Sequence, residues 1–184
     1  RTQEYVRTLA SALQSHPRFA SYIGKHGIDN LARSAPLHDI GKVGIPDHIL
    51  LKPGKLTPDE WEIMKTHAEL GSKAIAQAEA DAEKPVGFLA IAKEIAHHHH
   101  EKWDGSGYPA GLCGEDIPVS ARLMALADVF DALICKRVYK PAFSYDAAHR
   151  IIVEGSGHHF DPDVVNAFLA QYERFTSIAD AYAE

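Results

Sequence analysis

The sequence predicts an all-α protein. No stretch shows the sustained alternation of apolar and polar residues that a half-buried strand requires, whereas apolar residues recur at helical spacing through most of the chain. Helix-starting signals stand at Thr57, Ser144 and Asp161, in front of or inside such patterns. The chain has 184 residues and neither an internal repeat nor a low-complexity linker, so its length fits one large domain.

Apolar spacing predicts two helices in the first quarter of the chain. The first covers roughly residues 2–14 and the second roughly residues 29–41, where Gly41 ends the pattern. Residues 44–54 contain two prolines and are expected to form a loop, because proline lacks a backbone donor and fixes its own φ angle.

The clearest helix start is at Thr57. Its hydroxyl can cap the helix, Pro58 suits the first helical position, and Glu60 can return a hydrogen bond to the capping residue. Apolar residues at helical spacing carry this helix as far as Ile75. A further helix is expected over residues 86–100, with one apolar face turned to the core.

A glycine-rich loop and three helices complete the chain. The loop is expected over residues 101–118, and a long helix over residues 119–137. Ser144 can cap a short helix, and Asp161, followed by a proline, can cap a last helix to about Phe175.

The domain is expected to cover residues 1–175, and residues 176–184 are expected to be a C-terminal tail that frays. The chain starts at Arg1, without Met and inside a helical pattern. We therefore expect an excised fragment, with a sensor domain or a membrane segment upstream.

Composition restricts the classes of function. A formal net charge of −6 argues against sequence-independent binding of DNA or RNA, which needs a basic surface. Cys113 and Cys135 are isolated and indicate a reducing, cytoplasmic compartment. No apolar stretch is long enough to cross a membrane, so no membrane contact is expected from this chain.

Histidine is the compositional outlier, with 12 residues, many of them beside carboxylates or other histidines. His38 and Asp39 are adjacent, and four histidines follow one another at residues 97–100. Mixed imidazole and carboxylate ligands suit iron, manganese, zinc or nickel, and a metal pair suits the hydrolysis of phosphate esters. Consecutive helical residues project about 100° apart, so His38 and Asp39 are expected to straddle two ions, with the carboxylate as the bridge.

His67 and Asp128 are further candidates for this site. Taken alone, His67 on a half-apolar helix is more often a packed core residue, and Asp128 could be a buried hydrogen-bonding group. As a set they are harder to explain this way, because a buried Asp39 or Asp128 without a partner would cost several kcal/mol. Helix geometry does not select which of the four consecutive histidines would bind.

Long motifs follow one another over nearly the whole chain, and in this order they resemble the HD-GYP family of the HD phosphohydrolase superfamily. They are Leu37-His38-Asp39-Ile40-Gly41-Lys42, Ile45-Pro46-Asp47, Lys52-Pro53-Gly54, Met64-Lys65-Thr66-His67, the segments 99–109 and 128–133, Arg137, Tyr139, Lys140 and His159-Phe160-Asp161-Pro162.

The resemblance implies a helical bundle with a central metal site and a Gly-Tyr-Pro loop. It implies a metal-dependent phosphodiesterase that hydrolyses cyclic di-GMP to linear pGpG, and in some members to GMP, in bacterial second-messenger signalling. The implied cofactors are two divalent ions, iron or manganese in the first place and nickel or zinc otherwise. Some members hold a third ion through residues upstream of Arg1. The implied metal ligands are His38, Asp39, His67, His99, His100 and Asp128.

The resemblance also implies roles in catalysis and substrate binding. Asp39 and Lys42 are the implied catalytic residues, and Lys42 would lie near the scissile phosphate. The implied substrate contacts, besides Lys42, are Tyr108, Asp131, Arg137 and Lys140. From the residues alone, Arg137 and Lys140 could equally be a solvated helix end, where cations are favoured.

The glycine-rich loop predicts a nucleotide contact. Two glycines allow its backbone unusual conformations, so that Tyr108 can be held to stack on a base or to hydrogen-bond it. The alternative is a tight connection in which Tyr108 simply packs. Trp103 could stack on a base, although core packing is favoured, and Glu101 is expected to orient a ligand histidine.

Alternatives remain for the substrate and the partners. The substrate could be another cyclic dinucleotide, such as 3′,3′-cyclic GMP-AMP, or the chain could be a non-catalytic module that binds a cyclic dinucleotide. A receiver domain upstream, as in a response regulator, is expected from the resemblance. The protein partner could be a second copy of the chain, in a homodimer, or a GGDEF (diguanylate cyclase) domain.

Overall fold

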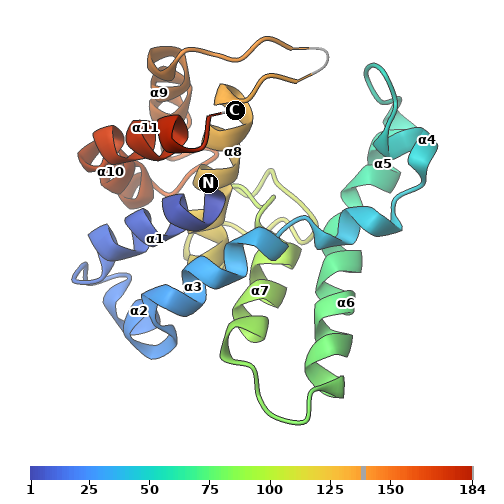
Figure 1. Cartoon of the computed structure of the whole chain (residues 1–184), viewed down its shortest axis with the longest axis horizontal. Helices are drawn as coiled ribbons and strands as arrows, with labels where there is room; N and C mark the ends of the chain where they lie inside the picture. The colour runs from blue at the N-terminus through green and yellow to red at the C-terminus, as the bar shows by residue number, and fades with distance from the viewer. Residues whose placement is uncertain (138–139, 184) are drawn as a thin grey trace.

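The computed structural model describes residues 1–137 and 140–183, and these residues form helices and no strand, as the sequence predicts (Figure 1). Two isolated bridges, Arg137 with Lys140 and Ser156 with Phe160, are the β contacts within this part of the chain. The α-helices are α1 (Thr2–Leu13), α2 (Ala20–His26), α3 (Ile28–Ser34), α4 (Asp47–Leu50), α5 (Pro58–Lys65), α6 (His67–Asp81), α7 (Gly87–His98), α8 (Val119–Ile134), α9 (Tyr145–Glu154), α10 (Pro162–Ala170) and α11 (Tyr172–Ala181). Three short 3₁₀ segments lie between them: η1 (Ala35–Leu37), η2 (Ile40–Gly44) and η3 (Gly114–Asp116).

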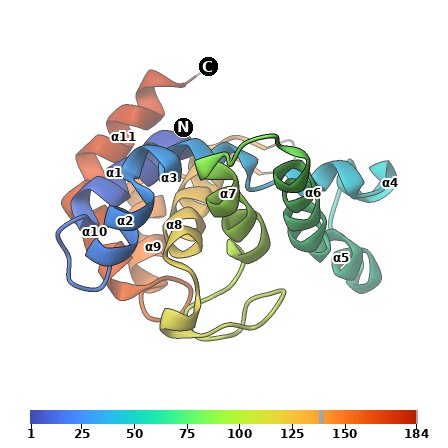
Figure 2. The ribbon, with the colours of Figure 1, turned by 90° about the horizontal axis from the view of Figure 1, so that it is seen from below.

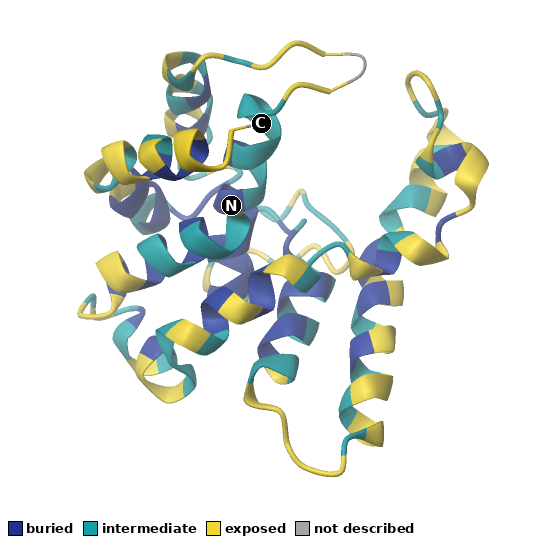
Figure 3. Cartoon of the chain, in the orientation of Figure 1, coloured by how far each residue is buried: buried dark blue, intermediate teal, exposed yellow. Residues whose placement is uncertain are grey.

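Helix α8 is the centre of the fold. Its first nine residues, 119–127, and Phe130 are all buried, and α1, α7, α9 and α10 pack around it (Figures 2 and 3). Aromatic rings fill the space between α1, α8, α10 and α11. Tyr5 stacks on Phe175 with 4.7 Å between ring centroids, and Phe130 meets Tyr5 edge-on at 5.4 Å. Such offset and edge-on pairs stabilise a core beyond the area that they bury.

Helices α4 and α5 form an arm, residues 45–66, that extends beyond α6 and away from the main core (Figures 1 and 2). None of the residues of α5 is buried. The predicted capping box is present, because Thr57 Oγ1 accepts from the Glu60 N–H and the Glu60 carboxylate accepts from the Thr57 N–H. Lys52 donates to the same Glu60 carboxylate at 2.5 Å, which ties the loop after α4 to the start of α5.

The helix that the sequence predicts over residues 29–41 is interrupted. Helix α3 ends at Ser34, and two 3₁₀ segments follow, with His38 and Asp39 at the junction between them. Pro36 accounts for the change, since it lacks the N–H that an α-helix needs at that point. The prediction that His38 and Asp39 end an α-helix was therefore wrong.

The helix predicted from Thr57 to Ile75 is two helices, α5 and α6, separated at Thr66. The Thr66 hydroxyl donates to the Ile63 carbonyl at 2.6 Å and so competes with the helical bond to that carbonyl. His67 consequently stands at the start of a new helix.

The C-terminal residues also differ from expectation. Helix α11 continues to Ala181, so most of the segment expected to fray is helical, and Ile178 and Ala179 within it are buried. The short helix α2 was not predicted either. The caps at Ser144 and Asp161 are confirmed, because their side chains accept from the Ala147 and Asp163 N–H groups. Among the described residues, no helix is long and apolar enough to cross a membrane.

The segment η2 and helix α6 touch backbone to backbone. A Cβ atom added at Gly41 would lie 1.9 Å from the His67 carbonyl oxygen and 2.4 Å from the Gly71 nitrogen. Both neighbours are main-chain atoms, which cannot turn aside as a flexible side chain can. Only glycine fits this approach.

We predict that Gly41→Ala lowers the free energy of unfolding by about 3 kcal/mol, because overpacking forces the two segments apart. Urea denaturation followed by circular dichroism measures this. Gly24→Ala is the matched control, since Gly24 lies in α2 with nothing within 4 Å of the added Cβ. It should raise the free energy of unfolding by about 0.5–1 kcal/mol. Equal effects of the two substitutions would contradict the packing argument.

Candidate metal centre

Three segments that are far apart in the sequence bring four polar side chains to one point. Asp39 comes from the junction of η1 and η2, His67 from the first residue of α6, and His99 and His100 from the end of α7. One nitrogen or oxygen of each of these four residues lies within 4.8 Å of those of the other three. A metal ion could therefore contact all four.

The Asp39 carboxylate is at the centre of this group. Its Oδ1 lies 3.5 Å from His67 Nε2 and 3.6 Å from His99 Nε2. Its Oδ2 lies 3.3 Å from His38 Nε2. A carboxylate between imidazoles on both sides can bridge two cations.

His38 and Asp128 extend the cluster on one side, and His100 on another. His38 Nε2 lies 3.4 Å from Asp128 Oδ1, which projects from α8. His100 Nε2 lies 3.0 Å from His67 Nε2. The six residues implied as metal ligands thus form one connected group.

Backbone carbonyls fix the orientation of three of the rings. The Nδ1 atoms of His38, His67 and His99 lie 2.8, 2.6 and 2.8 Å from the carbonyl oxygens of Ala35, Met64 and Ile95. A carbonyl oxygen only accepts, so each Nδ1 carries the proton and donates it. In the neutral imidazole, Nε2 then presents its lone pair to the cluster, which is the arrangement found in histidines that bind metals.

The charges of the cluster perturb one another. Burial would raise the pKa of Asp39, but the His38, His67 and His99 imidazoles beside its carboxylate hold it well below its usual value. Burial would lower the pKa of His38, yet its bonds to Asp128 and Asp39 raise it to about 10. Burial, together with His99 and His67, lowers the pKa of His100 to about 2. The cluster therefore attracts positive charge at the carboxylates and repels protons at His100.

Two buried atoms of the cluster test whether a metal fits. Asp39 Oδ1 and His99 Nε2 are buried and lack a hydrogen-bond partner within the described part of the chain. Such atoms are destabilising when they are left without a partner. Both are good ligands of a divalent cation, and they face each other across the cluster. The residues present therefore fit a metal.

Two of the residues expected to contact substrate adjoin the cluster. Lys42 Nζ donates to Asp39 Oδ2 at 2.7 Å, and about two fifths of the Lys42 side chain, 41%, is exposed. The ring of Tyr108 stacks on that of His100, with 4.8 Å between centroids and 20° between planes. Both side chains are thus close enough to reach a ligand held by the cluster.

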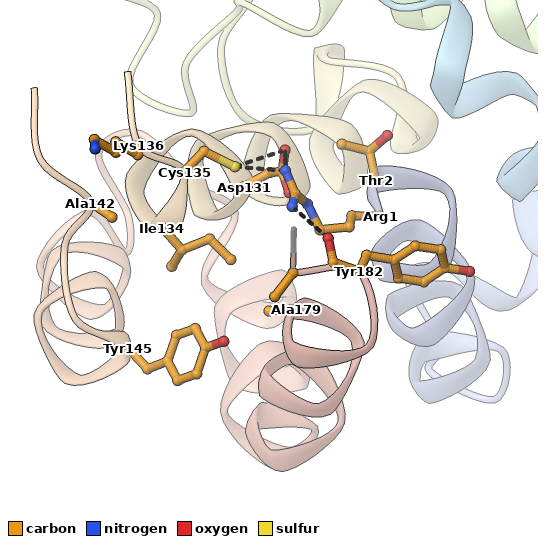
Figure 4. A pocket seen from close by; sticks show the side chains of 11 residues that line it. Arg1, Thr2, Asp131, Ile134, Cys135, Lys136, Ala142, Tyr145, Ala179 and Tyr182 are labelled. Carbon is orange, nitrogen blue, oxygen red and sulfur yellow. Dashed lines mark hydrogen bonds and ion pairs between the residues drawn. The ribbon is translucent and has the colours of Figure 1, made fainter. Parts of the chain in front are cut away.

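Asp131 is engaged elsewhere, as Figure 4 shows. Arg1 Nε donates to Asp131 Oδ1 at 2.7 Å, and another Arg1 nitrogen donates to Cys135 Sγ at the same distance. These residues line a cavity of about 690 Å³ together with Tyr145 and Tyr182. The predicted substrate contact of Asp131 would therefore compete with its ion pair to Arg1.

Arg137 and Lys140 pair through their backbones, with N–H to carbonyl distances of 3.0 and 3.1 Å, and both are exposed. Within the described residues neither side chain bonds to the cluster. Tyr139, which the resemblance includes, lies outside the described residues.

The prediction that Glu101 orients a ligand histidine was wrong. Its buried carboxylate accepts from the N–H groups of Ala110 and Leu112 at 2.8 and 3.0 Å. The histidine nearest to it is His98, at 3.5 Å, which is not part of the four-residue group around Asp39. Glu101 therefore holds the loop that carries Tyr108.

Sequence reasoning missed two side chains of α5 that reach Tyr108. The Trp61 ring meets Tyr108 edge-on at 6.0 Å, and Lys65 Nζ lies 5.8 Å from the centre of the same ring. Trp61 belongs to the apolar residues whose helical spacing predicts a helix here. The spacing of Trp61 and Lys65, one helical turn apart, was the available signal that both share a face.

Comparisons with known proteins show which family the chain belongs to. The family model described as HD domain matches residues 6–164. A cyclic di-GMP phosphodiesterase of Vibrio cholerae is 63% identical over 97% of this chain and 36% of that protein. A 3'3'-cGAMP-specific phosphodiesterase of the same organism is 45% identical over 82% of this chain and 28% of that protein.

A solved structure extends the likeness to the fold. The crystal structure of a cyclic GMP-AMP specific phosphodiesterase of V. cholerae matches with a TM-score of 0.57 and 21% identity, over 96% of this chain and 50% of that one. The chain spans little more than a third of the length of the first of these curated relatives. On its motifs, its fold and these matches, the chain belongs to the HD domain family, in the HD-GYP branch.

Proposed function

We propose that this chain is a metal-dependent phosphodiesterase that hydrolyses cyclic di-GMP to linear pGpG, with GMP as a further product to be tested. The observation that carries the proposal is the Asp39 carboxylate set among imidazoles whose Nε2 atoms face it. The relative that is 63% identical over 97% of this chain, named a cyclic di-GMP phosphodiesterase, supports the choice of substrate.

The proposed cofactors are two divalent ions, iron or manganese, with zinc and nickel as alternatives. His38, Asp39, His67, His99, His100 and Asp128 would hold them. Paired divalent ions lower the pKa of water toward neutrality and stabilise negative charge on a phosphate. A third ion would need ligands from outside this chain.

The residues of the chain would bind and orient the substrate around these ions. Lys42, already at the Asp39 carboxylate, would place an ammonium beside the scissile phosphate and stabilise its developing charge. Tyr108 would present its ring to a base. Arg137 and Lys140 would bring exposed cations to a second phosphate, with Arg137 able to grip it through two hydrogen bonds.

A second candidate substrate is 3′,3′-cyclic GMP-AMP. The relative that is 45% identical over 82% of this chain carries that specificity in its name. A non-catalytic module that binds a cyclic dinucleotide is the candidate from another class. We further propose that the domain of residues 1–175 acts below an upstream sensor or receiver domain, and that a homodimer or a GGDEF domain is its protein partner.

We expect the chain, loaded anaerobically with manganese or iron(II), to convert cyclic di-GMP to pGpG faster than it converts 3′,3′-cyclic GMP-AMP. Chromatography of the products measures both rates in parallel. Faster turnover of the mixed dinucleotide would favour the second candidate. Binding without turnover, at confirmed metal occupancy, would favour the non-catalytic module.

Asp39→Ala should abolish turnover and reduce the metal bound per chain, because it removes the carboxylate that three imidazoles share. Elemental analysis measures the metal, and circular dichroism checks that the helices persist. Asp29→Ala is the matched control, since 73% of the Asp29 side chain is exposed and its partner is the surface residue Arg7. Full activity in Asp39→Ala would refute the bridging role.

Lys42→Ala should lower kcat by roughly 100-fold while the metal content stays unchanged, as expected when a charge that stabilises the transition state is lost. Lys42→Arg should recover part of the rate. Lys73→Ala, which removes a lysine whose side chain is 77% exposed on α6, should have no effect. Loss of metal in Lys42→Ala would show instead that Lys42 acts by holding Asp39.

A further inference from the structure

We propose that Trp61 on α5 is a stacking platform for one nucleobase of the cyclic dinucleotide. The inference rests on the proposed function and adds a substrate-binding residue on the arm. An aromatic side chain can stack on any of the nucleobases, because every base has a π-face.

The rings of three residues connect the metal cluster to the arm. Tyr108 stacks on His100, and Trp61 meets Tyr108 edge-on, with 85° between the ring planes. The Trp61 ring stands nearly perpendicular to Tyr108, so the two rings do not stack and at most one face of Trp61 is turned to Tyr108. The two rings form a corner beside His100, and Tyr108 lies between Trp61 and His100.

Trp61 is a large aromatic side chain that stays partly exposed. Its exposed fraction is 45%, and α5 buries none of its residues. A large aromatic ring exposed beside a candidate binding site offers apolar surface that a ligand can cover. The edge-on contact with Tyr108 covers only part of the ring.

Charge beside Trp61 suits a nucleotide. Lys65 lies one helical turn further along α5 and approaches the ring of Tyr108, so Trp61 and Lys65 turn the same face of the helix toward the loop. The partner of Lys65 is the exposed Glu62, at 2.8 Å. A base on Trp61 would thus have a cation within reach of its phosphate.

The arm is built to hold Trp61 in place. The capping box at Thr57 and the bond from Lys52 to Glu60 fix the first turn of α5, from which Trp61 projects. A ring that is already oriented loses little conformational freedom when a base binds, so stacking contributes more to affinity.

Fluorescence tests the contact directly, because Trp61 and Trp103 are the two tryptophans of the chain. Trp103 is half-buried with Arg18 5.4 Å from its ring. In metal-loaded protein mixed rapidly with cyclic di-GMP, Trp103→Phe should keep the quenching seen before turnover, and Trp61→Phe should lose most of it. Inorganic phosphate should quench neither variant.

Kinetics provide the second readout. Trp61→Ala should raise KM for cyclic di-GMP by roughly 5- to 150-fold, with a smaller change in kcat, as expected for the loss of one stacked base. Trp61→Phe should recover most of the affinity. Ile63→Ala, which removes an exposed apolar residue from the same helix, should leave KM unchanged.

Three outcomes would overturn the inference in distinguishable ways. Unchanged KM in Trp61→Ala, with equal quenching in both single-tryptophan variants, would show that Trp61 does not stack on a base. Trp61 would then belong to a protein-binding surface. A loss of kcat alone would make Trp61 a support for the loop of Tyr108. Neither quenching nor turnover in the unmodified protein would refute the proposed function itself, and this inference with it.

Discussion

The contact of the Asp39 carboxylate with three imidazoles is the interaction on which the rest of the structure depends. It requires a junction between 3₁₀ segments, a helix start and a helix end to meet at one point, beside a buried central helix. Each ligand stands at or near the end of an element, except Asp128, whose helix is fixed by burial. Positions at such ends allow a side chain to leave the regular packing of the core and to bind an ion.

The parts of the fold that follow from short-range chemistry could be predicted from the sequence. The capping box at Thr57 and the caps at Ser144 and Asp161 depend on residues three positions apart or fewer, and all three are present. The break at Pro36 was missed, although the proline that causes it was visible. Helix α11 was missed because Phe175 and Ile178 are stabilised by tertiary packing against distant residues.

The site, too, could be predicted where it depends on local sequence and not where it depends on tertiary contacts. Its six proposed metal ligands could be named from the sequence because they belong to long motifs, whereas the distances between them depend on four segments meeting in space. Glu101 was assigned wrongly because its partners are backbone amides 9 and 11 residues away, which no side-chain pattern reveals. Asp131 has its ion-pair partner 130 residues away, at Arg1, so its engagement is also a property of the fold.

The close approach of Gly41 to His67 has a consequence for how the site varies. The separation of Asp39 from His67 is set by main chains in direct contact, not by the volumes of side chains between them. The van der Waals radii of main-chain atoms do not change when side chains are exchanged. Substitutions in the aromatic core around α8 can therefore accumulate without altering the distance between these two ligands, and the sequence of the scaffold can diverge while the geometry of the site stays the same.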